Sequence, residues 1–122
     1  MCCFYKLLYS FYILHLTEVA DWGKAQSTWG TQDEIKELNK NFGMIKSTFI
    51  DRRIPLIIGE YGAATENKNI ESVRNFLYSG CNACYDRNIV PVLWDTPGGF
   101  YDRNKAAMAD PVLKNMLNSV KG

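Results

Sequence analysis

The chain of 122 residues has little of nearly every feature that marks a specialised class of protein. It has one histidine, four cysteines and four prolines, and its net charge is +1 because 14 Lys and Arg face 13 Asp and Glu. Without a basic excess or a Lys/Arg cluster it has nothing that would follow a phosphate backbone, so we expect no nucleic-acid partner. Neither of its two strand-like apolar segments is followed by a glycine-rich phosphate loop, which argues against a nucleotide-binding domain.

Cysteine is too sparse for a mini-protein held together by disulfides. The pair Cys81 and Cys84 has the spacing found in redox and zinc motifs, but it falls inside a helical pattern. The other two cysteines, Cys2 and Cys3, are adjacent, which is poor spacing for zinc ligands. We interpret all four as packing or inert thiols and expect no metal site.

A membrane-spanning run is also missing. Residues 1–20 form an atypical apolar segment, whose first sixteen residues, MCCFYKLLYSFYILHL, are interrupted by Lys6 and His15. That length is too short to span a bilayer, so we expect no membrane partner. The segment carries no clear signal peptide, because its start is weakly charged and no small-x-small cleavage site follows. A secretory apolar region, a buried strand and an irregular chain start remain the alternatives.

What the sequence does have is a globular composition, with 47% hydrophobic and 22% charged residues, enough for one domain. A capping box from Thr31 to Glu34 and apolar residues at steps of three and four predict a helix that ends near residues 51–53. The other expected elements, in chain order, are an optional strand near Tyr12–Leu16, a strand at Pro55–Glu60, a helix at Asn69–Arg87, a strand at Ile89–Trp94, a long loop at Asp95–Ala109, and a helix from the N-cap Asp110 to Val120.

This alternation of helices and strands predicts an α/β fold with a parallel sheet. Both strand runs are continuously apolar, which indicates strands buried on both faces. In such folds the functional groups gather beyond the carboxyl ends of the strands. Glu60 and Trp94 stand at those ends, so we expect them to share one rim.

From pattern alone, several interpretations of these residues stay open. Glu60 is either a functional carboxylate or a solvated acid at the end of a strand. Trp94 is either a platform for a sugar ring or a core or rim aromatic, and the same alternatives apply to Trp22 and Trp29. Asp95 is expected to cap the turn that follows it.

The segment Pro55–Gly62, with the sequence PLIIGEYG, resembles the seventh-strand motif of glycoside hydrolase family 5, the cellulase family. Pro91–Asp95 is similar to the eighth strand of that family, and Trp29–Thr31 and Asn41–Phe49 also match in type and spacing. The resemblance covers roughly residues 22–120. It implies that residues 21–122 are the C-terminal portion of a (β/α)₈ TIM barrel, an incomplete one.

The resemblance also implies roles. Glu60 would be the nucleophile of a retaining, endo-β-1,4-glucanase-like enzyme acting on plant cell-wall β-glucan, and Trp94 the platform beneath the sugar at the cleavage point. Trp29 and His15 would join the substrate-binding set. His15 is followed by Leu16 and Thr17, so it is either the remnant of the His-Tyr pair on the sixth strand of the family or a core or surface histidine. Neither a metal nor an organic cofactor is needed for this chemistry, and a polymeric substrate implies secretion.

One departure from the family pattern changes the expected activity. The general acid/base of the family is a Glu within an Asn-Glu-Pro motif, and this tripeptide does not occur here. Retaining hydrolysis needs two carboxyl groups roughly 5–5.5 Å apart. We therefore expect a fragment that is weakly active or inactive alone, and that self-associates through exposed sheet edges. The alternatives are a non-catalytic glycan-binding α/β module and an unrelated doubly wound α/β domain.

Overall fold

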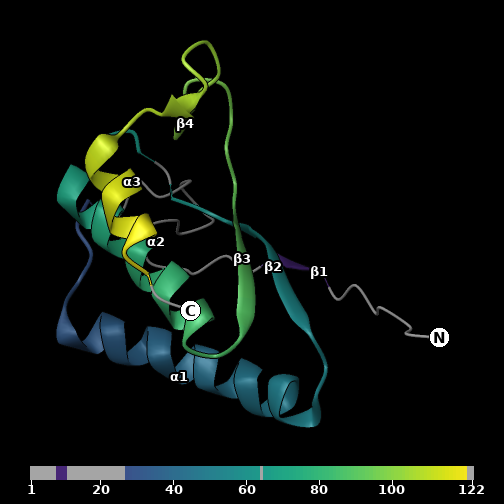
Figure 1. Ribbon diagram of the computed structural model, residues 1–122. Coiled ribbons are helices and arrows are strands. Elements are labelled where there is room, and N and C mark those ends of the chain that lie inside the picture. The colour runs from purple at the N-terminus through teal and green to yellow at the C-terminus, as the bar shows by residue number, and fades with distance from the viewer. Residues whose placement is uncertain (1–7, 11–26, 64, 121–122) are drawn as a thin grey trace.

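The computed structural model describes residues 8–10, 27–63 and 65–120 (Figure 1). The elements along the chain are β1 (Leu8–Ser10), α1 (Gln32–Thr48), a short 3₁₀ helix (Ile50–Arg52), β2 (Leu56–Tyr61), α2 (Ile70–Tyr85), β3 (Ile89–Leu93), β4 (Tyr101–Asp102), β5 (Ala107–Met108) and α3 (Pro111–Asn118).

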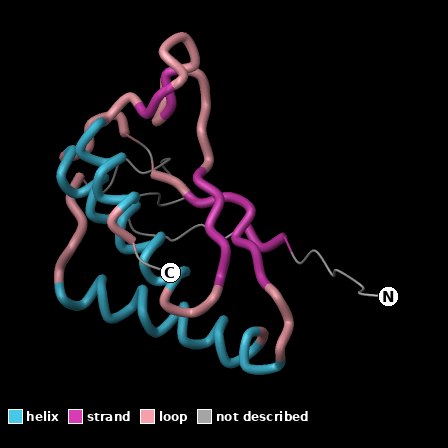
Figure 2. The backbone as a smooth tube through the Cα atoms, viewed as in Figure 1, coloured by secondary structure: helices cyan, strands magenta, loops and turns pink. Residues whose placement is uncertain are grey.

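The strands β1, β2 and β3 form one parallel sheet in that order, and β4 pairs with β5 in a separate antiparallel hairpin (Figure 2). The predicted parallel α/β fold is therefore confirmed, and the described residues form no closed barrel. The strand expected near Tyr12–Leu16 lies outside the described residues. A strand is present earlier in the chain, at Leu8–Ser10, so the sheet includes part of the atypical segment 1–20.

The helices begin where the local sequence satisfies their first amide groups. At α1 the Thr31 hydroxyl accepts from the Glu34 N–H at 3.3 Å, and the Glu34 carboxylate accepts from the Thr31 N–H at 2.8 Å. The Asn69 side chain caps α2 by accepting from the Ser72 N–H at 3.0 Å. Beyond α1 the 3₁₀ turn stops at Arg53, which has the left-handed φ of 62° that ends a helix.

The Asp110 carboxylate joins the last helix, α3, to its neighbour α2. Asp110 caps α3 by accepting from the N–H groups of Val112 at 2.9 Å and Leu113 at 3.2 Å. The same carboxylate accepts two bonds from the Arg74 guanidinium on α2, at 2.7 and 3.1 Å. Arg74 also bonds Glu71, so α2 and α3 lie side by side around an ion-pair cluster (Figure 1).

The hydrophobic core lies on one side of the sheet. It is built from buried side chains of α1, β2, α2, β3 and α3, together with a residue of the loop before α1. The most deeply buried large side chains are Phe42, Ile58, Leu77, Cys84 and Leu113. Burying each of the Phe, Ile and Leu side chains among these contributes roughly 1.5–3 kcal/mol relative to leaving it in water.

The other face of the sheet is uncovered in the described part of the chain. Side chains alternate across a strand, and those that point away from the core are exposed: Ile57 by 42%, Val90 by 55% and Val92 by 44%. The prediction that both strands are buried on both faces is therefore wrong. A sheet that has not closed into a barrel has only its helix-covered face buried, so the continuously apolar runs remain half in water.

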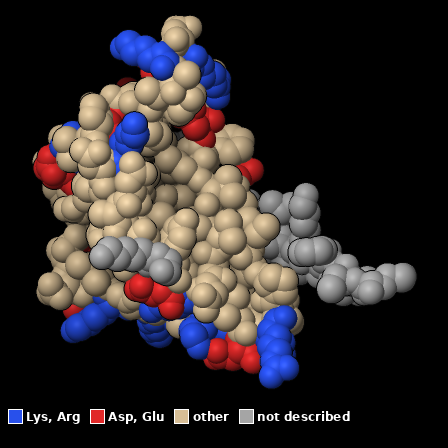
Figure 3. Space-filling model, viewed as in Figure 1, with Lys and Arg blue, Asp and Glu red and all other residues tan. Residues whose placement is uncertain are grey.

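The charged residues are spread over the edges of the molecule. Lys and Arg lie beside Asp and Glu over α1 and near the β4–β5 hairpin, and the centre of the face in view carries few charges (Figure 3). No helix in the described ranges is long and apolar enough to cross a bilayer.

Candidate functional site

The rim at the carboxyl ends of β2 and β3 contains a β-bulge. Ile58 pairs with Pro91 and Tyr61 pairs with Leu93, so Gly59 and Glu60 on β2 lie opposite a single residue of β3. A bulge of this kind bends the strand and redirects a side chain, and such bulges often occur beside active sites. Ile58 and Tyr61 are buried in the core, whereas Glu60, which lies between them in the bulge, is partly exposed.

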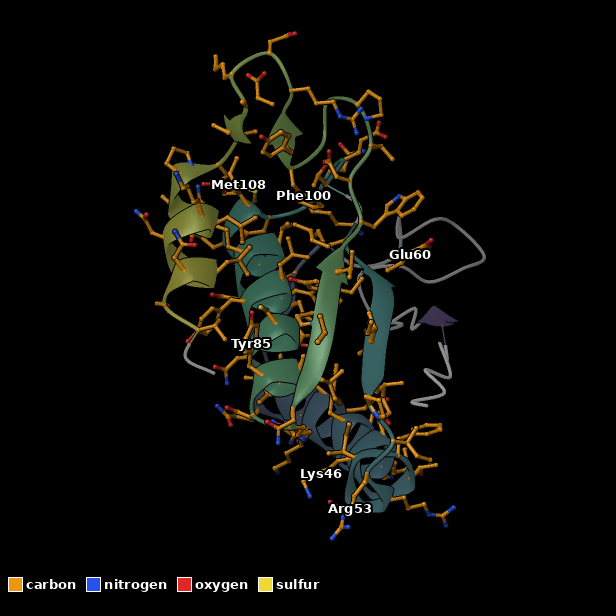
Figure 4. All side chains as sticks on the ribbon, turned by 45° about the vertical axis from the view of Figure 1, so that its right-hand side comes forward. Lys46, Arg53, Glu60, Tyr85, Phe100 and Met108 are labelled. Carbon is orange, nitrogen blue, oxygen red and sulfur yellow. The ribbon has the colours of Figure 1, made fainter. Side chains whose placement is uncertain are left out.

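Glu60 lies on β2, the central strand of the sheet, between β1 and β3. Its Cα partner on β1 is Ser10, and it precedes the last residue of β2. The side chain projects from the end of β2 away from α2 and α3 (Figure 4). It is partly exposed, and no hydrogen bond or ion pair joins its carboxylate to the other residues that the structure describes.

Trp94 directly follows β3, the strand that pairs with β2, on which Glu60 lies. Its N–H donates to the Tyr61 carbonyl at 2.7 Å, which extends the β2–β3 ladder by one step. Gly62 lies against its backbone, since a Cβ on Gly62 would be 3.6 Å from the Cβ and the carbonyl oxygen of Trp94. Trp94 is 53% exposed, and an exposed indole is a surface on which a ring can stack. Glu60 and Trp94 therefore share one rim, as the sequence predicts.

Below the rim, Tyr61 anchors β2 to α2. It is 8% exposed and lies beside Cys81 of α2. Burial raises the pKa of Tyr61 above its ordinary value, raises the pKa of Cys81, and raises the pKa of Cys84 to about 12. Both cysteines are buried and unpaired, which confirms the prediction that they are packing thiols. The described part of the chain contains no group of three His, Cys, Asp or Glu side chains able to hold a metal ion.

The residue after Trp94 organises the loop beyond β3. The Asp95 carboxylate accepts from the Phe100 N–H at 2.6 Å and from the Tyr101 N–H at 3.2 Å, and lies 3.6 Å from the Arg103 guanidinium. We call this arrangement the Asp95 clasp (Asp95, Gly99, Phe100, Tyr101 and Arg103). It confirms that Asp95 caps the turn that follows, and it leaves this carboxylate engaged in the loop.

The loop itself contains the β4–β5 hairpin, which the sequence did not predict. The hairpin stands above the carboxyl end of β3 (Figure 1). Phe100 and Met108, one just before β4 and one in β5, are partly buried against the core below (Figure 4). At its tip, Asp102 accepts from the N–H groups of Asn104 and Lys105 at 3.0 and 3.1 Å. The hairpin is thus a compact structure attached to the rim.

The other predicted site residues are not at this rim. Trp29 is 6% exposed, and the edge of one ring meets the face of the other where it contacts Phe76, with ring centroids 5.4 Å apart. A stacking platform needs an exposed face, so the burial of Trp29 corrects its expected role in substrate binding. His15 and Trp22 lie outside the described residues.

A small apolar pocket of about 210 Å³ lies elsewhere, between α1 and the first half of β2. Its lining includes Met44, Phe49 and Leu56 but no residue of the rim. It has no charged group to orient a ligand, so the rim remains the candidate site.

Neither a protein-family model nor a curated protein matches the chain. Solved structures do. A broad-specificity endoglucanase of glycoside hydrolase family 5, subfamily 4, from an uncultured bovine rumen ciliate is 33% identical, with a TM-score of 0.73, over 78% of this chain and 29% of its own. A tri-modular endo-β-1,4-glucanase of that subfamily from Bacillus licheniformis is 27% identical, with a TM-score of 0.69, over 75% of this chain and 18% of its own. Its complex with cellotetraose has a TM-score of 0.68 and 28% identity over the same shares of the two chains. The chain thus spans less than a third of the length of these enzymes.

Proposed function

Because this chain corresponds to part of the catalytic domain of glycoside hydrolase family 5, we propose that it provides the nucleophile and one sugar platform of a retaining β-1,4-glucanase. The observation that carries the proposal is the placement of Glu60 by the bulge, partly exposed, beside the half-exposed Trp94. In this proposal Trp94 stacks on the sugar at the cleavage point, and Glu60 attacks its anomeric carbon.

In the proposed step Glu60 supplies the nucleophile but not the proton that the leaving group needs. The Glu60 oxygen forms a covalent bond to the anomeric carbon while the bond to the leaving oxygen breaks. That oxygen needs a proton from a second carboxyl group roughly 5–5.5 Å from the first. Asp95, the acid in the loop after β3, is engaged by two backbone amides, and the sequence contains no Asn-Glu-Pro motif. We infer that the chain alone hydrolyses natural glucan weakly or not at all.

The substrate class in this proposal is a β-1,4-linked glucan, such as that of plant cell walls. The support is the Bacillus licheniformis enzyme, which is solved with cellotetraose, together with the exposed indole at the rim. Because such polymers lie outside cells, the proposal places the working protein outside the cell as well.

A dinitrophenyl 2-deoxy-2-fluoro-cellobioside tests the nucleophile separately from the acid. Its leaving group departs without a proton, so the missing acid/base does not matter, and the fluorine slows hydrolysis of the covalent product. We expect intact mass spectrometry to show one added glycosyl group, and peptide mapping to locate it on Glu60. Glu60→Gln should take up none. A label on another residue, or equal labelling of the Gln variant, contradicts the assignment.

Titration with cellotetraose tests the platform. We expect a saturable change in the indole NMR signal of Trp94 and loss of binding in Trp94→Ala. Tyr85→Ala is the matched control, since Tyr85 is an aromatic residue 45% exposed on α2 and away from the rim. Equal weakening by both substitutions would exclude Trp94 as the platform.

A second candidate function is a non-catalytic glycan-binding module. The observation in its favour is the engagement of Asp95, which leaves Glu60 without a described carboxyl partner. With Trp29 buried, its binding surface rests on Trp94. Cellotetraose binding together with no covalent labelling of Glu60 would select this function over the first.

A further inference from the structure

The direction of the Trp94 side chain needs an explanation. Because the residue is 53% exposed, packing alone does not fix the orientation of its indole. A platform for a sugar ring must nevertheless hold its face at one angle, since binding otherwise has to offset the loss of rotamer freedom. The direction of an exposed side chain is then set by the backbone that carries it. The backbone of Trp94 is held on both sides.

On its N-terminal side, the backbone of Trp94 is held by the hydrogen-bond ladder between β2 and β3. The Trp94 N–H donates to the Tyr61 carbonyl at 2.7 Å, and Tyr61 is buried against α2. A Cβ added at Gly62 would be 3.6 Å from the Cβ and the carbonyl oxygen of Trp94, so no side chain separates the two backbones here. The bond to Tyr61 fixes the amide side of Trp94 to the core.

On the side of the loop, the hold is the Asp95 clasp. Two amides, those of Phe100 and Tyr101, and the Arg103 guanidinium converge on one carboxylate. Gly99 fits inside the closed loop only because it has no side chain, since a Cβ there would be 2.7 Å from Asp95 Oδ1 and 3.0 Å from the Thr96 carbonyl oxygen.

The clasp is in turn fastened to the core. Phe100 is partly buried against it, and the Ala109 N–H donates to the Phe100 carbonyl at 2.8 Å. The side chain of Asp95 is 18% exposed, so its bonds are shielded from competing water. The backbone after Trp94 is therefore attached to the hydrophobic core through Phe100, as the backbone before it is attached through Tyr61.

We propose that Asp95 is a positioning residue, which orients the Trp94 indole through the clasp so that the indole receives a β-1,4-linked gluco-oligosaccharide. Asp95 has no contact with the sugar in this proposal. Its effect on glycan affinity rests on the proposed function, but its effect on the order of the indole does not.

The decisive experiment follows the indole N–H signals of the ¹⁵N-labelled chain, with Trp94→Phe used to assign the Trp94 signal. In Asp95→Ala we expect the heteronuclear NOE of the Trp94 indole to fall and amide exchange at Phe100 and Tyr101 to accelerate at least ~10-fold. The Trp29 indole signal should stay in place, which shows that the core remains folded. Asp95→Asn should restore order at Trp94, because its carboxamide oxygen still accepts the two amide bonds.

Asp102→Ala is the matched control, because Asp102 makes the same kind of two-amide contact at the hairpin tip. It should release the tip amides and leave the Trp94 indole unchanged. The proposal is overturned if Asp95→Ala leaves the Trp94 indole as ordered as in the parent, or if Asp102→Ala disorders it equally. Should Asp95→Ala not fold, Gly99→Ala is the second perturbation, since its methyl group must displace the Asp95 carboxylate.

The glycan measurement completes the test. Cellotetraose affinity should fall by about tenfold in Asp95→Ala, the loss of roughly one aromatic stacking contact, and recover in Asp95→Asn. Unchanged affinity in Asp95→Ala overturns the role in binding. If the parent chain shows no response to cellotetraose, the proposed function fails, and the indole order alone decides whether Asp95 positions Trp94.

Discussion

Replacing Asp110 by alanine should loosen the C-terminal helix by an amount that the structure allows us to estimate. The substitution removes the N-cap of α3, which typically contributes about 1 kcal/mol. It also removes the paired bonds from Arg74, and hydrogen bonds to charged groups contribute roughly 1.5–3 kcal/mol. Because Arg74 retains its contact with Glu71, the lower part of that range applies. We expect the free energy of unfolding to fall by about 2–3 kcal/mol.

Asp110→Asn separates the two contributions. The amide oxygen still accepts from the N–H groups of α3, but the negative charge opposite Arg74 is gone, so we expect a loss of about 1–2 kcal/mol. Asp33→Ala is the control, since the Asp33 side chain is 95% exposed and its ion pair with Lys36 spans 3.7 Å. Such exposed pairs contribute about 0–1 kcal/mol.

Urea unfolding followed by far-UV circular dichroism measures these differences, and its pH dependence tests their cause. The hydrogen bonds from Arg74 hold the pKa of Asp110 below its ordinary value. A carboxyl group whose pKa is lowered in the folded state adds stability above its unfolded pKa, about 3.9, and loses it as the pH falls through the folded pKa. The gap between the parent and Asp110→Asn should therefore close below about pH 4. A gap that persists there, or a loss under ~1 kcal/mol in Asp110→Ala at pH 7, would refute this account.

Three further predictions concern the clasp, the uncovered sheet face and the thiols. Gly99→Ala should destabilise the chain by at least ~1 kcal/mol in the same urea assay, because a Cβ would be 2.7 Å from a carboxylate oxygen. Gly43→Ala, in the middle of α1 with nothing within 4 Å of the added Cβ, should instead stabilise it by roughly 0.5–1 kcal/mol. We propose that the chain self-associates through its uncovered sheet face and edges, so sedimentation velocity should show dimers or larger species that Val90→Lys reduces. Val112→Lys, on an equally exposed residue of α3, should not reduce them. At pH 8 the native chain should react slowly with a disulfide reagent at Cys84, whose pKa is about 12, and rapidly once unfolded. Fast labelling of Cys84 in the folded chain, located by peptide mapping, would contradict its burial.

The parts of the fold that the sequence predicts correctly depend on neighbouring residues. The caps at Thr31 and Asp110 use partners two or three positions away, so their signals are visible in the chain itself. The alternation of helices and apolar strands likewise indicates the parallel sheet. Glu60 and Trp94 were placed at one rim because parallel strands end on the same edge.

The parts that it misses depend on distant partners. The bulge at Gly59–Glu60 exists only relative to the register of β3, about thirty residues away in the chain. Trp29 is buried because Phe76 meets it across the core, and nothing next to Trp29 in the sequence indicates this. The β4–β5 hairpin has strands of two residues each, too short for an alternating pattern. The prediction of burial on both faces is wrong because continuously apolar runs are typical of strands that are covered on both sides, whereas the described residues cover only one face of this sheet.

That difference between the two faces of the sheet has a consequence for the order of assembly. The helix-side core joins α1, β2, α2, β3 and α3, which follow one another along the chain, so each contact closes a short stretch of polypeptide. Contacts of short range form early and rapidly, because little chain entropy is lost in making them. The opposite face has no partner among these elements, so it stays exposed after they have packed. We expect a folding chain to complete its helix-side core first and to leave Ile57, Val90 and Val92 as an exposed apolar surface.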